Sequence, residues 1–127
     1  MTKKPDILIV EDDRDTLAGL TALLRSVGYG VTGAASFEEG RRALQQKPAL
    51  LMTDVRLGAY NGLHLIIRAR AEAPHLPAIV LTGHSDVVVR REAERLGAVY
   101  IEKPVVPEKL LVLVSDTLSR RDKQPQS

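Results

Sequence analysis

Short runs of apolar residues alternate along the chain with longer segments in which apolar residues recur at helical spacing. The runs ILIV and AIVLT contain no polar alternation, which is typical of strands buried on both faces of a parallel sheet. The predicted strands are Ile7–Val10, Val31–Ala35, Ala49–Thr53, Ala78–Thr82 and Val99–Ile101. The predicted helices are Arg14–Val27, Ser36–Gln46, Asn61–Ala73, Ser85–Leu96 and Pro107–Leu118.

The ends of these helices carry signals of their own. Asp13 stands where it can cap the first helix, and Gly28 follows that helix as a stop. Ser36 and Glu39 have the spacing of a capping box, and Pro48 prevents the second helix from continuing. The boundaries are therefore predicted by residue chemistry as well as by periodicity.

A strand followed by a helix, five times over, predicts an α/β fold. Right-handed connections then give a five-stranded parallel sheet with helices on both faces. The order 2-1-3-4-5 is the flavodoxin-like one, in which ligands bind at the carboxyl ends of the first and third strands. We expect one domain over residues 1–120, with the polar residues 121–127 as a tail or the start of a linker.

Composition narrows the possible functions. The sequence has no Cys, which excludes disulfides, thiol catalysis and zinc sites built on Cys. The net charge is only +2 and the Arg residues are spread along the chain, so we expect no direct binding of nucleic acid by this domain. The apolar run near the N-terminus is too short for a membrane span, and we expect a cytoplasmic protein with no membrane contact.

Polar residues follow the strands at the edge where the carboxyl ends meet. Glu11 and Asp12 follow the first strand, Asp54 the third, Thr82 ends the fourth, and Lys103 follows the fifth. Crowded carboxylates repel one another unless a cation is present, and Mg²⁺ prefers such oxygen ligands. The pattern predicts a magnesium site beside an ammonium and a hydroxyl.

These groups suit phosphoryl transfer. A carboxylate such as Asp54 can act as the nucleophile toward a phosphoryl donor. Mg²⁺ and the Lys103 ammonium would stabilise the charge on the transferring group, and Thr82 would donate a hydrogen bond to it.

Two other classes fit the sequence less well. Aspartyl phosphatases of the haloacid dehalogenase type and Toprim nucleases need a D-x-D at a strand end, but Asp54 is followed by Val55 and Arg56. A dinucleotide-binding domain needs G-x-G-x-x-G after its first strand, where this chain has the acidic EDDRDT.

Together, ILIVEDD, the lone Asp54, LTG and EKP make residues 5–119 similar to the receiver domains of response regulators. The spacing agrees: 42 positions from Asp12 to Asp54, 28 more to Thr82 and 21 more to Lys103. The resemblance implies a receiver-type fold and a phosphoacceptor switch of a two-component system, not an enzyme in its own right. The alternative is a receiver-like interaction module that no longer depends on phosphorylation.

The resemblance also implies roles for residues around the acceptor. Asp12, Asp54 and the backbone carbonyl of Arg56 would bind Mg²⁺, and Glu11 would hold a metal-bound water. One departure is Gly58, which stands where the family often has Pro and loosens the loop after the acceptor.

The resemblance assigns the switch to Thr82 and Tyr100, with Lys103 as the phosphate partner aimed by a cis Lys103–Pro104 peptide bond. Tyr100 is also compatible with an ordinary half-buried core position. Phosphorylation would change the surface of the fourth helix, fifth strand and fifth helix. The outward Arg residues of that surface, where a partner or a dimer mate is expected, are Arg90, Arg91 and Arg95.

Arg56 and His84 each lie two residues beyond a site residue and would set the lifetime of the phosphoryl group, or else are solvated loop residues. The expected partners are a sensor histidine kinase or phosphotransfer protein, an output domain or partner protein of unknown kind, and a second copy of the chain in a phosphorylation-dependent dimer.

Overall fold

The elements of the structure follow the alternation in the sequence. The computed structural model describes residues 4–83 and 85–123. Its elements are, in chain order, β1 (Asp6–Val10), α1 (Arg14–Ser26), β2 (Gly30–Ala34), α2 (Phe37–Ala43), the 3-10 helix η1 (Leu44–Gln46), β3 (Leu50–Asp54), β4 (Arg56–Leu57), β5 (Tyr60–Asn61), α3 (Leu63–Glu72), β6 (Ala78–Thr82), α4 (Val87–Arg95), β7 (Val99–Glu102) and α5 (Pro107–Lys123).

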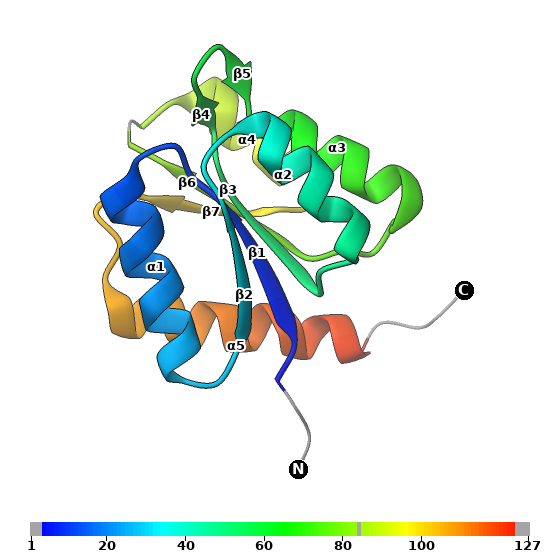
Figure 1. Ribbon diagram of the computed structural model, residues 1–127. Coiled ribbons are helices and arrows are strands. Elements are labelled where there is room, and N and C mark those ends of the chain that lie inside the picture. The colour runs from blue at the N-terminus through cyan, green and yellow to red at the C-terminus, as the bar shows by residue number, and fades with distance from the viewer. Residues whose placement is uncertain (1–3, 84, 124–127) are drawn as a thin grey trace.

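The strands form a parallel sheet and a separate hairpin. Within the described residues, five strands pair in parallel in the order β2-β1-β3-β6-β7, and β4 pairs with β5 antiparallel. Counting the strands of the large sheet alone, this is the predicted order 2-1-3-4-5. The hairpin was not predicted from the sequence, because strands of two residues are too short to show a period. The hairpin rises beyond the edge of the large sheet (Figure 1).

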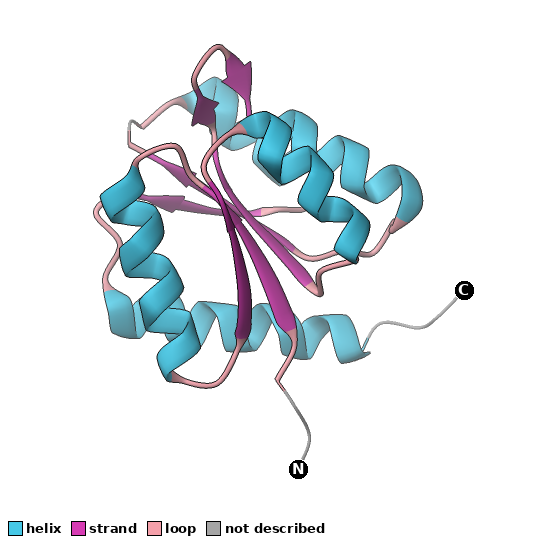
Figure 2. Ribbon diagram, in the orientation of Figure 1, coloured by secondary structure: helices cyan, strands magenta, loops and turns pink. Residues whose placement is uncertain are grey.

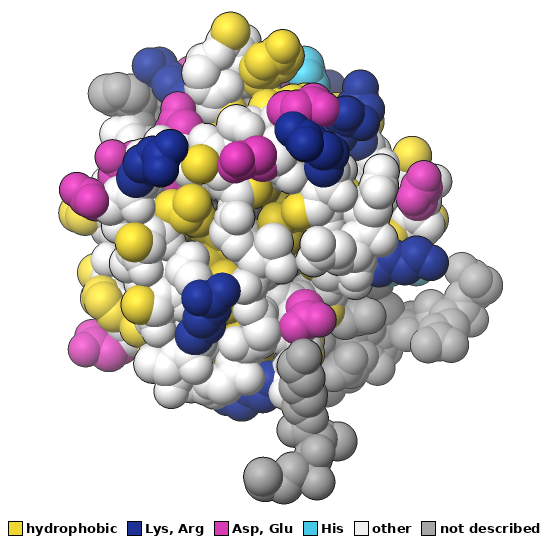
Figure 3. Space-filling view, in the orientation of Figure 1, with side chains coloured by type: hydrophobic (Ala, Val, Ile, Leu, Met, Phe, Trp, Pro, Cys, Tyr) yellow, Lys and Arg dark blue, Asp and Glu magenta, His cyan; other side chains and the backbone are white. Residues whose placement is uncertain are grey.

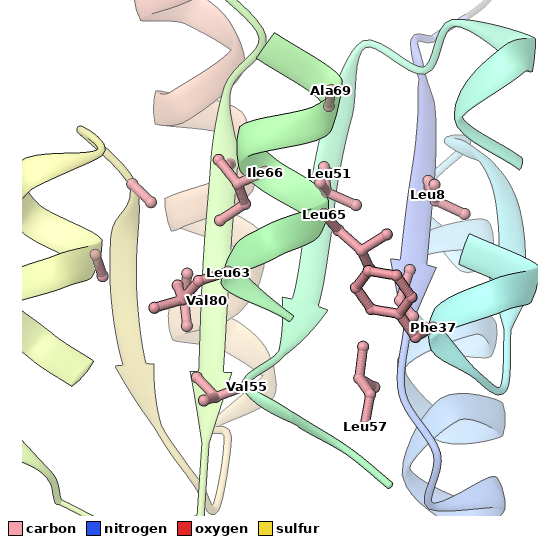
Figure 4. Close-up of a cluster of buried hydrophobic side chains, with 14 of the residues drawn as sticks. Leu8, Phe37, Leu51, Val55, Leu57, Leu63, Leu65, Ile66, Ala69 and Val80 are labelled. Atoms are coloured by element: carbon pink, nitrogen blue, oxygen red, sulfur yellow. The ribbon is translucent and has the colours of Figure 1, made fainter. Parts of the chain in front are cut away.

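Alternate residues of the central strands enter two hydrophobic cores, one on each face of the sheet. Leu8 and Val10 belong to the core that α2, α3 and α4 cover, part of which is drawn in Figure 4. Ile7 and Ile9 belong to the core that α1 and α5 cover. Figure 2 shows the sheet between these two layers of helices, which confirms the predicted α/β class.

The predicted helix caps are present. The Asp13 carboxylate accepts one hydrogen bond from the Thr16 hydroxyl and another from the Thr16 N–H at 3.0 Å, and these two contacts, the hydroxyl first, lower the pKa of Asp13. The Ser36 hydroxyl accepts from the Glu39 N–H at 3.1 Å. The Glu39 carboxylate in turn accepts from the Ala35 N–H at 2.6 Å, one residue before the N–H that a capping box would supply.

Helix α5 is longer than its periodicity predicts. It runs to Lys123, five positions beyond the predicted end at Leu118, and so enters the segment assigned to the tail. The rest of the predicted tail, residues 124–127, lies outside the described residues. Across the part of the chain that the structure describes, the helices are too short or too polar for any of them to cross a membrane.

Candidate functional site

The carboxyl ends of the strands meet at one edge of the sheet, as predicted. Val10 of β1 pairs with Thr53 of β3, so the residues that follow each of them are neighbours. Asp54 pairs with Leu81 of β6, one position before Thr82, and Thr82 pairs with Glu102 of β7, one position before Lys103. The parallel register therefore brings together residues that lie far apart in the sequence.

Three carboxylates form a cluster at this edge. Each of Glu11, Asp12 and Asp54 has a carboxylate oxygen within 4.8 Å of the others. Glu11 is fully buried and Asp54 nearly so, whereas Asp12 is exposed. The cluster thus has a buried side and a side open to solvent, and its oxygen-only donor set suits a hard divalent cation such as Mg²⁺.

Lys103 lies against two of these carboxylates. Its Nζ is 3.1 Å from Asp54 Oδ2 and also forms an ion pair with Glu11 Oε1. The Lys103 N–H donates to the Thr82 carbonyl at 2.8 Å, which fixes the start of the following loop. The Lys103–Pro104 peptide bond is cis, which confirms that prediction.

The electrostatics of the cluster reflect both burial and the closeness of the charged groups. Burial, and next the hydrogen bond with Asp54, raise the pKa of Glu11 to about 7, although Lys103 pulls it in the opposite direction. Burial alone would lower the pKa of the Lys103 ammonium, but its contacts with Glu11 and Asp54 outweigh burial and leave that pKa raised. A bound cation would relieve the repulsion between the carboxylates, so the residues present fit a metal ion.

The backbone carbonyl of Asp54 is held in place by two residues whose roles were not predicted from the pattern. The Thr53 hydroxyl donates to the Asp54 carbonyl at 2.9 Å. Gly62 packs against the same carbonyl so closely that a Cβ on it would lie 1.9 Å from the Asp54 oxygen. The Gly62 N–H also donates to the Val55 carbonyl at 2.7 Å. The signal for Gly62 in the sequence was its spacing, eight residues after Asp54.

The β4–β5 hairpin borders the cluster. Gly58, at the turn of this hairpin, has a φ of 62° and donates its N–H to Asp12 Oδ2 at 3.2 Å. Arg56 belongs to β4 and its side chain is exposed. Its carbonyl as a metal ligand and its side chain as a lifetime residue both stay predictions.

The two predicted switch residues lie on neighbouring strands. Thr82 is buried at the end of β6. Tyr100 is half-buried on β7, and the Arg90 guanidinium of α4 lies 5.8 Å from the centre of its ring. The other predicted lifetime residue, His84, lies outside the described residues.

Comparisons with known proteins agree with this geometry. Residues 7–115 match the model of the response regulator receiver domain. The chain is similar to the transcriptional regulatory protein FixJ of Bradyrhizobium diazoefficiens, at 32% identity over all of this chain and 63% of FixJ. It is also similar to the C4-dicarboxylate transport transcriptional regulatory protein DctD of Rhizobium meliloti, at 31% identity over 87% of this chain and 25% of DctD. The chain therefore spans less than two thirds of the length of these regulators.

Solved structures show the same likeness. A CheY-like receiver domain protein from Methanospirillum hungatei superposes with a TM-score of 0.90 at 30% identity, covering 96% of this chain and 99% of that one. A response regulator from Chloroflexus aurantiacus superposes with a TM-score of 0.81 at 35% identity, covering 92% of this chain and 99% of that one.

Proposed function

The chain belongs to the response regulator receiver domains of two-component systems, and from this premise we propose that it is a switch that accepts a phosphoryl group on Asp54. The observation that carries the proposal is the position of Asp54, which lies among Glu11, Asp12 and the Lys103 ammonium at the carboxyl edge of the sheet. A buried carboxylate that lies beside an ammonium group and two further carboxylates is typical of a nucleophile, and not of a group that only stabilises the fold.

The residues that would hold Mg²⁺ are Asp12, Asp54 and the Arg56 carbonyl, with Glu11 holding a metal-bound water. Mg²⁺ would supply neutralising charge to the transferring phosphoryl group. The support within this chain is the oxygen-only donor set, together with the pKa of Glu11, which burial first and then the contact with Asp54 raise.

The chain's own groups have separate tasks in the transfer. An Asp54 carboxylate oxygen attacks phosphorus and forms an O–P bond. The P–N bond to the donor's phosphohistidine breaks, and its electron pair leaves with the imidazole nitrogen. Lys103 shifts its contact from the free carboxylate to a phosphoryl oxygen and so stabilises negative charge there. Thr82 donates its hydroxyl proton in a hydrogen bond to another phosphoryl oxygen.

Phosphorylation would also change a surface of the domain that a partner can bind. Movement of Thr82 toward the phosphoryl group would vacate space that the Tyr100 ring then enters. Because Arg90 of α4 lies over that ring, a change at Tyr100 would alter the outer surface of α4, β7 and α5. In this proposal an output domain or partner protein binds this surface, and the regulators that this chain resembles are longer than it is.

The donor would be a sensor histidine kinase or a phosphotransfer protein. A largely apolar groove of about 930 Å³ runs between α1 and the loop after β7, next to Lys103. It is lined by Thr16, Gly19, Leu20, Ala22, Leu23, Lys103, Pro104, Val105 and Pro107. An amphipathic helix of the donor would fit such a groove and bring its phosphohistidine to Asp54.

Labelling with acetyl phosphate and with a phosphorylated histidine kinase tests the proposal. The wild type should be labelled only with Mg²⁺, and Asp54→Asn should lose the label. Asp116→Asn, an exposed change on α5, is the matched control and should be labelled like wild type. Stoichiometric labelling of Asp54→Asn would refute the acceptor. A wild type that no donor labels would favour the interaction module that does not depend on phosphorylation.

Ala22→Glu tests the groove separately. Ala22 is exposed on α1, lines the groove and is not one of the clustered carboxylates. The change should slow transfer from the protein donor and leave labelling by acetyl phosphate as in wild type. Equal loss with both donors would instead indicate damage to the acceptor site.

A further inference from the structure

We propose that Tyr60 is a positioning residue for phosphorylation: its ring, stacked on Phe37, holds the β4–β5 hairpin in place beside the carboxylate cluster. The inference rests on the proposed function of Asp54 and adds a residue that does not touch the reacting atoms. Tyr60 is an exposed aromatic side chain that nonetheless stacks on a defined partner.

The stack is well formed. The ring centroids of Phe37 and Tyr60 lie 4.9 Å apart, with an angle of 18° between the ring planes. Tyr60 is 60% exposed, so much of its side chain lies outside the core, and it stacks on the buried Phe37. Offset stacking at this distance is favourable beyond the burial of area.

The hairpin needs such an anchor. Each of its strands has two residues, and the register consists of Arg56 opposite Asn61 and Leu57 opposite Tyr60. A ladder of this length does not hold its own position in water. Leu57 points into the same core as Phe37, and Figure 4 shows both side chains in that cluster. Leu57 and Tyr60 are cross-strand partners, so the core holds one strand of the hairpin through Leu57 and the stack on Phe37 holds the other.

Phe37 is a rigid platform for this anchor. It is the first residue of α2, directly after the Ser36 cap, and is nearly buried. Helix α2 lies so close to β1 that a Cβ on Gly40 would meet a Val10 methyl at 2.8 Å. Val10 is the residue before Glu11, so the platform is fixed to the strand that carries the first two carboxylates.

The opposite side of the hairpin contacts the cluster itself. The Gly58 N–H donates to Asp12 Oδ2 at 3.2 Å, and the carbonyl proposed as a metal ligand belongs to Arg56 of the same hairpin. The hairpin therefore lies between Asp12 on one side and Phe37 on the other. Loss of the stack would let the hairpin move relative to Asp12. The distance between the Asp12 carboxylate and the Arg56 carbonyl, the two proposed ligands, would then no longer be fixed.

Two measurements on Tyr60→Ala test this proposal, with Tyr60→Phe as the matched control that keeps the ring. In metal-free protein, the Gly58 amide should exchange with solvent faster in Tyr60→Ala than in wild type. In a calorimetric titration with MgCl₂, Tyr60→Ala should bind Mg²⁺ roughly two- to tenfold more weakly, the range that corresponds to one aromatic pair. Tyr60→Phe should match wild type in both. Phe37→Leu, which keeps an apolar core residue but removes the platform, should behave like Tyr60→Ala.

The outcomes separate this inference from the proposed function. If wild type binds Mg²⁺ and Tyr60→Ala matches it in both affinity and Gly58 exchange, the positioning role is overturned. If Tyr60→Phe is weakened as much as Tyr60→Ala, the hydroxyl and not the stack is responsible, which also overturns it. A wild type that neither binds Mg²⁺ nor accepts a phosphoryl group would refute the proposed function, whatever the hairpin variants do. A parallel thermal unfolding curve shows whether any variant has lost its fold.

Discussion

Lys103 Nζ lies 3.1 Å from the Asp54 carboxylate while it also pairs with Glu11. One ammonium thus links the carboxyl ends of β1, β3 and β7. It neutralises part of the charge of the cluster before any ligand arrives, and a phosphoryl group on Asp54 would take over its contact.

Replacement of Lys103 by Met should separate metal binding from phosphoryl transfer. Met keeps most of the length of the side chain and removes its charge, so the cluster becomes more negative and Mg²⁺ should bind at least as tightly as in wild type. The rate of labelling by acetyl phosphate should fall roughly a hundredfold, because the transferring group loses a fixed cation. Titration of Mg²⁺ and single-turnover labelling measure the two effects.

Lys109→Met, on the exposed side of α5, is the control for the loss of one positive charge. It should leave both quantities as in wild type. Weaker Mg²⁺ binding by Lys103→Met would contradict the view that the ammonium and the metal compete for the same carboxylates.

Stability without metal should depend on pH through Glu11. Its pKa is about 7 in the folded protein against 4.5 ordinarily, so between these values the folded state binds the proton more tightly than the unfolded state. The resulting contribution is complete below pH 4.5 and is lost as pH rises through about 7. On the order of 2–3 kcal/mol of unfolding free energy should be lost across this window.

Urea unfolding of wild type and Glu11→Gln at several pH values isolates the contribution of Glu11 to the free energy of unfolding. The difference between the two proteins should change from pH 5 to pH 8 without metal. It should change less with saturating Mg²⁺, which stabilises the carboxylate form of Glu11. A difference that stays constant with pH would show that Glu11 does not titrate in this range.

Gly62→Ala should destabilise the fold and disturb the backbone at Asp54. A Cβ there would lie 1.9 Å from the Asp54 carbonyl oxygen and 2.6 Å from the Thr53 hydroxyl, so the backbone must shift. We expect a loss of roughly 2–3 kcal/mol in unfolding free energy. Gly19→Ala is the matched control on α1, where a Cβ meets nothing within 4 Å. It should instead stabilise the protein by about 0.5–1 kcal/mol, because Ala is the better helix former.

Phosphorylation should change the surface made by α4, β7 and α5. Beryllofluoride with Mg²⁺ should shift the amide resonances of these elements, with Tyr100 and Arg90 among those that respond. Asp54→Asn, treated in the same way, should show no such shifts. If the wild-type shifts are confined to the loops around Asp54, the output surface lies elsewhere or the switch does not operate.

Arg56 and His84 should control how long the phosphoryl group lasts. We expect both side chains to border the path of the attacking water, so that Arg56→Ala and His84→Ala speed hydrolysis between pH 6 and 8. The exposed side chain of Arg56 is free to pair with a phosphoryl oxygen, which supports this expectation. Rates equal to wild type in both variants would return the two residues to the class of solvated loop positions.

The sequence predicted the large elements because their signals are local. The buried strands and amphipathic helices are repeated patterns, and the caps at Asp13 and Ser36 depend on residues three positions away. The β4–β5 hairpin and the last turns of α5 escaped prediction. A strand of two residues shows no period. The residues after Leu118 that continue α5 are polar, so they show no apolar periodicity from which a helix could be predicted.

By itself, the sequence determined which residues come to the carboxyl edge of the sheet, since parallel strands all end on the same side. The tertiary structure alone decided how those residues meet. It placed Lys103 between Glu11 and Asp54, pressed Gly62 against the acceptor carbonyl, and stacked Tyr60 on Phe37. Each of these contacts joins side chains or backbone from different elements, and their distances depend on how helices and loops pack in three dimensions, which no periodicity along the chain encodes.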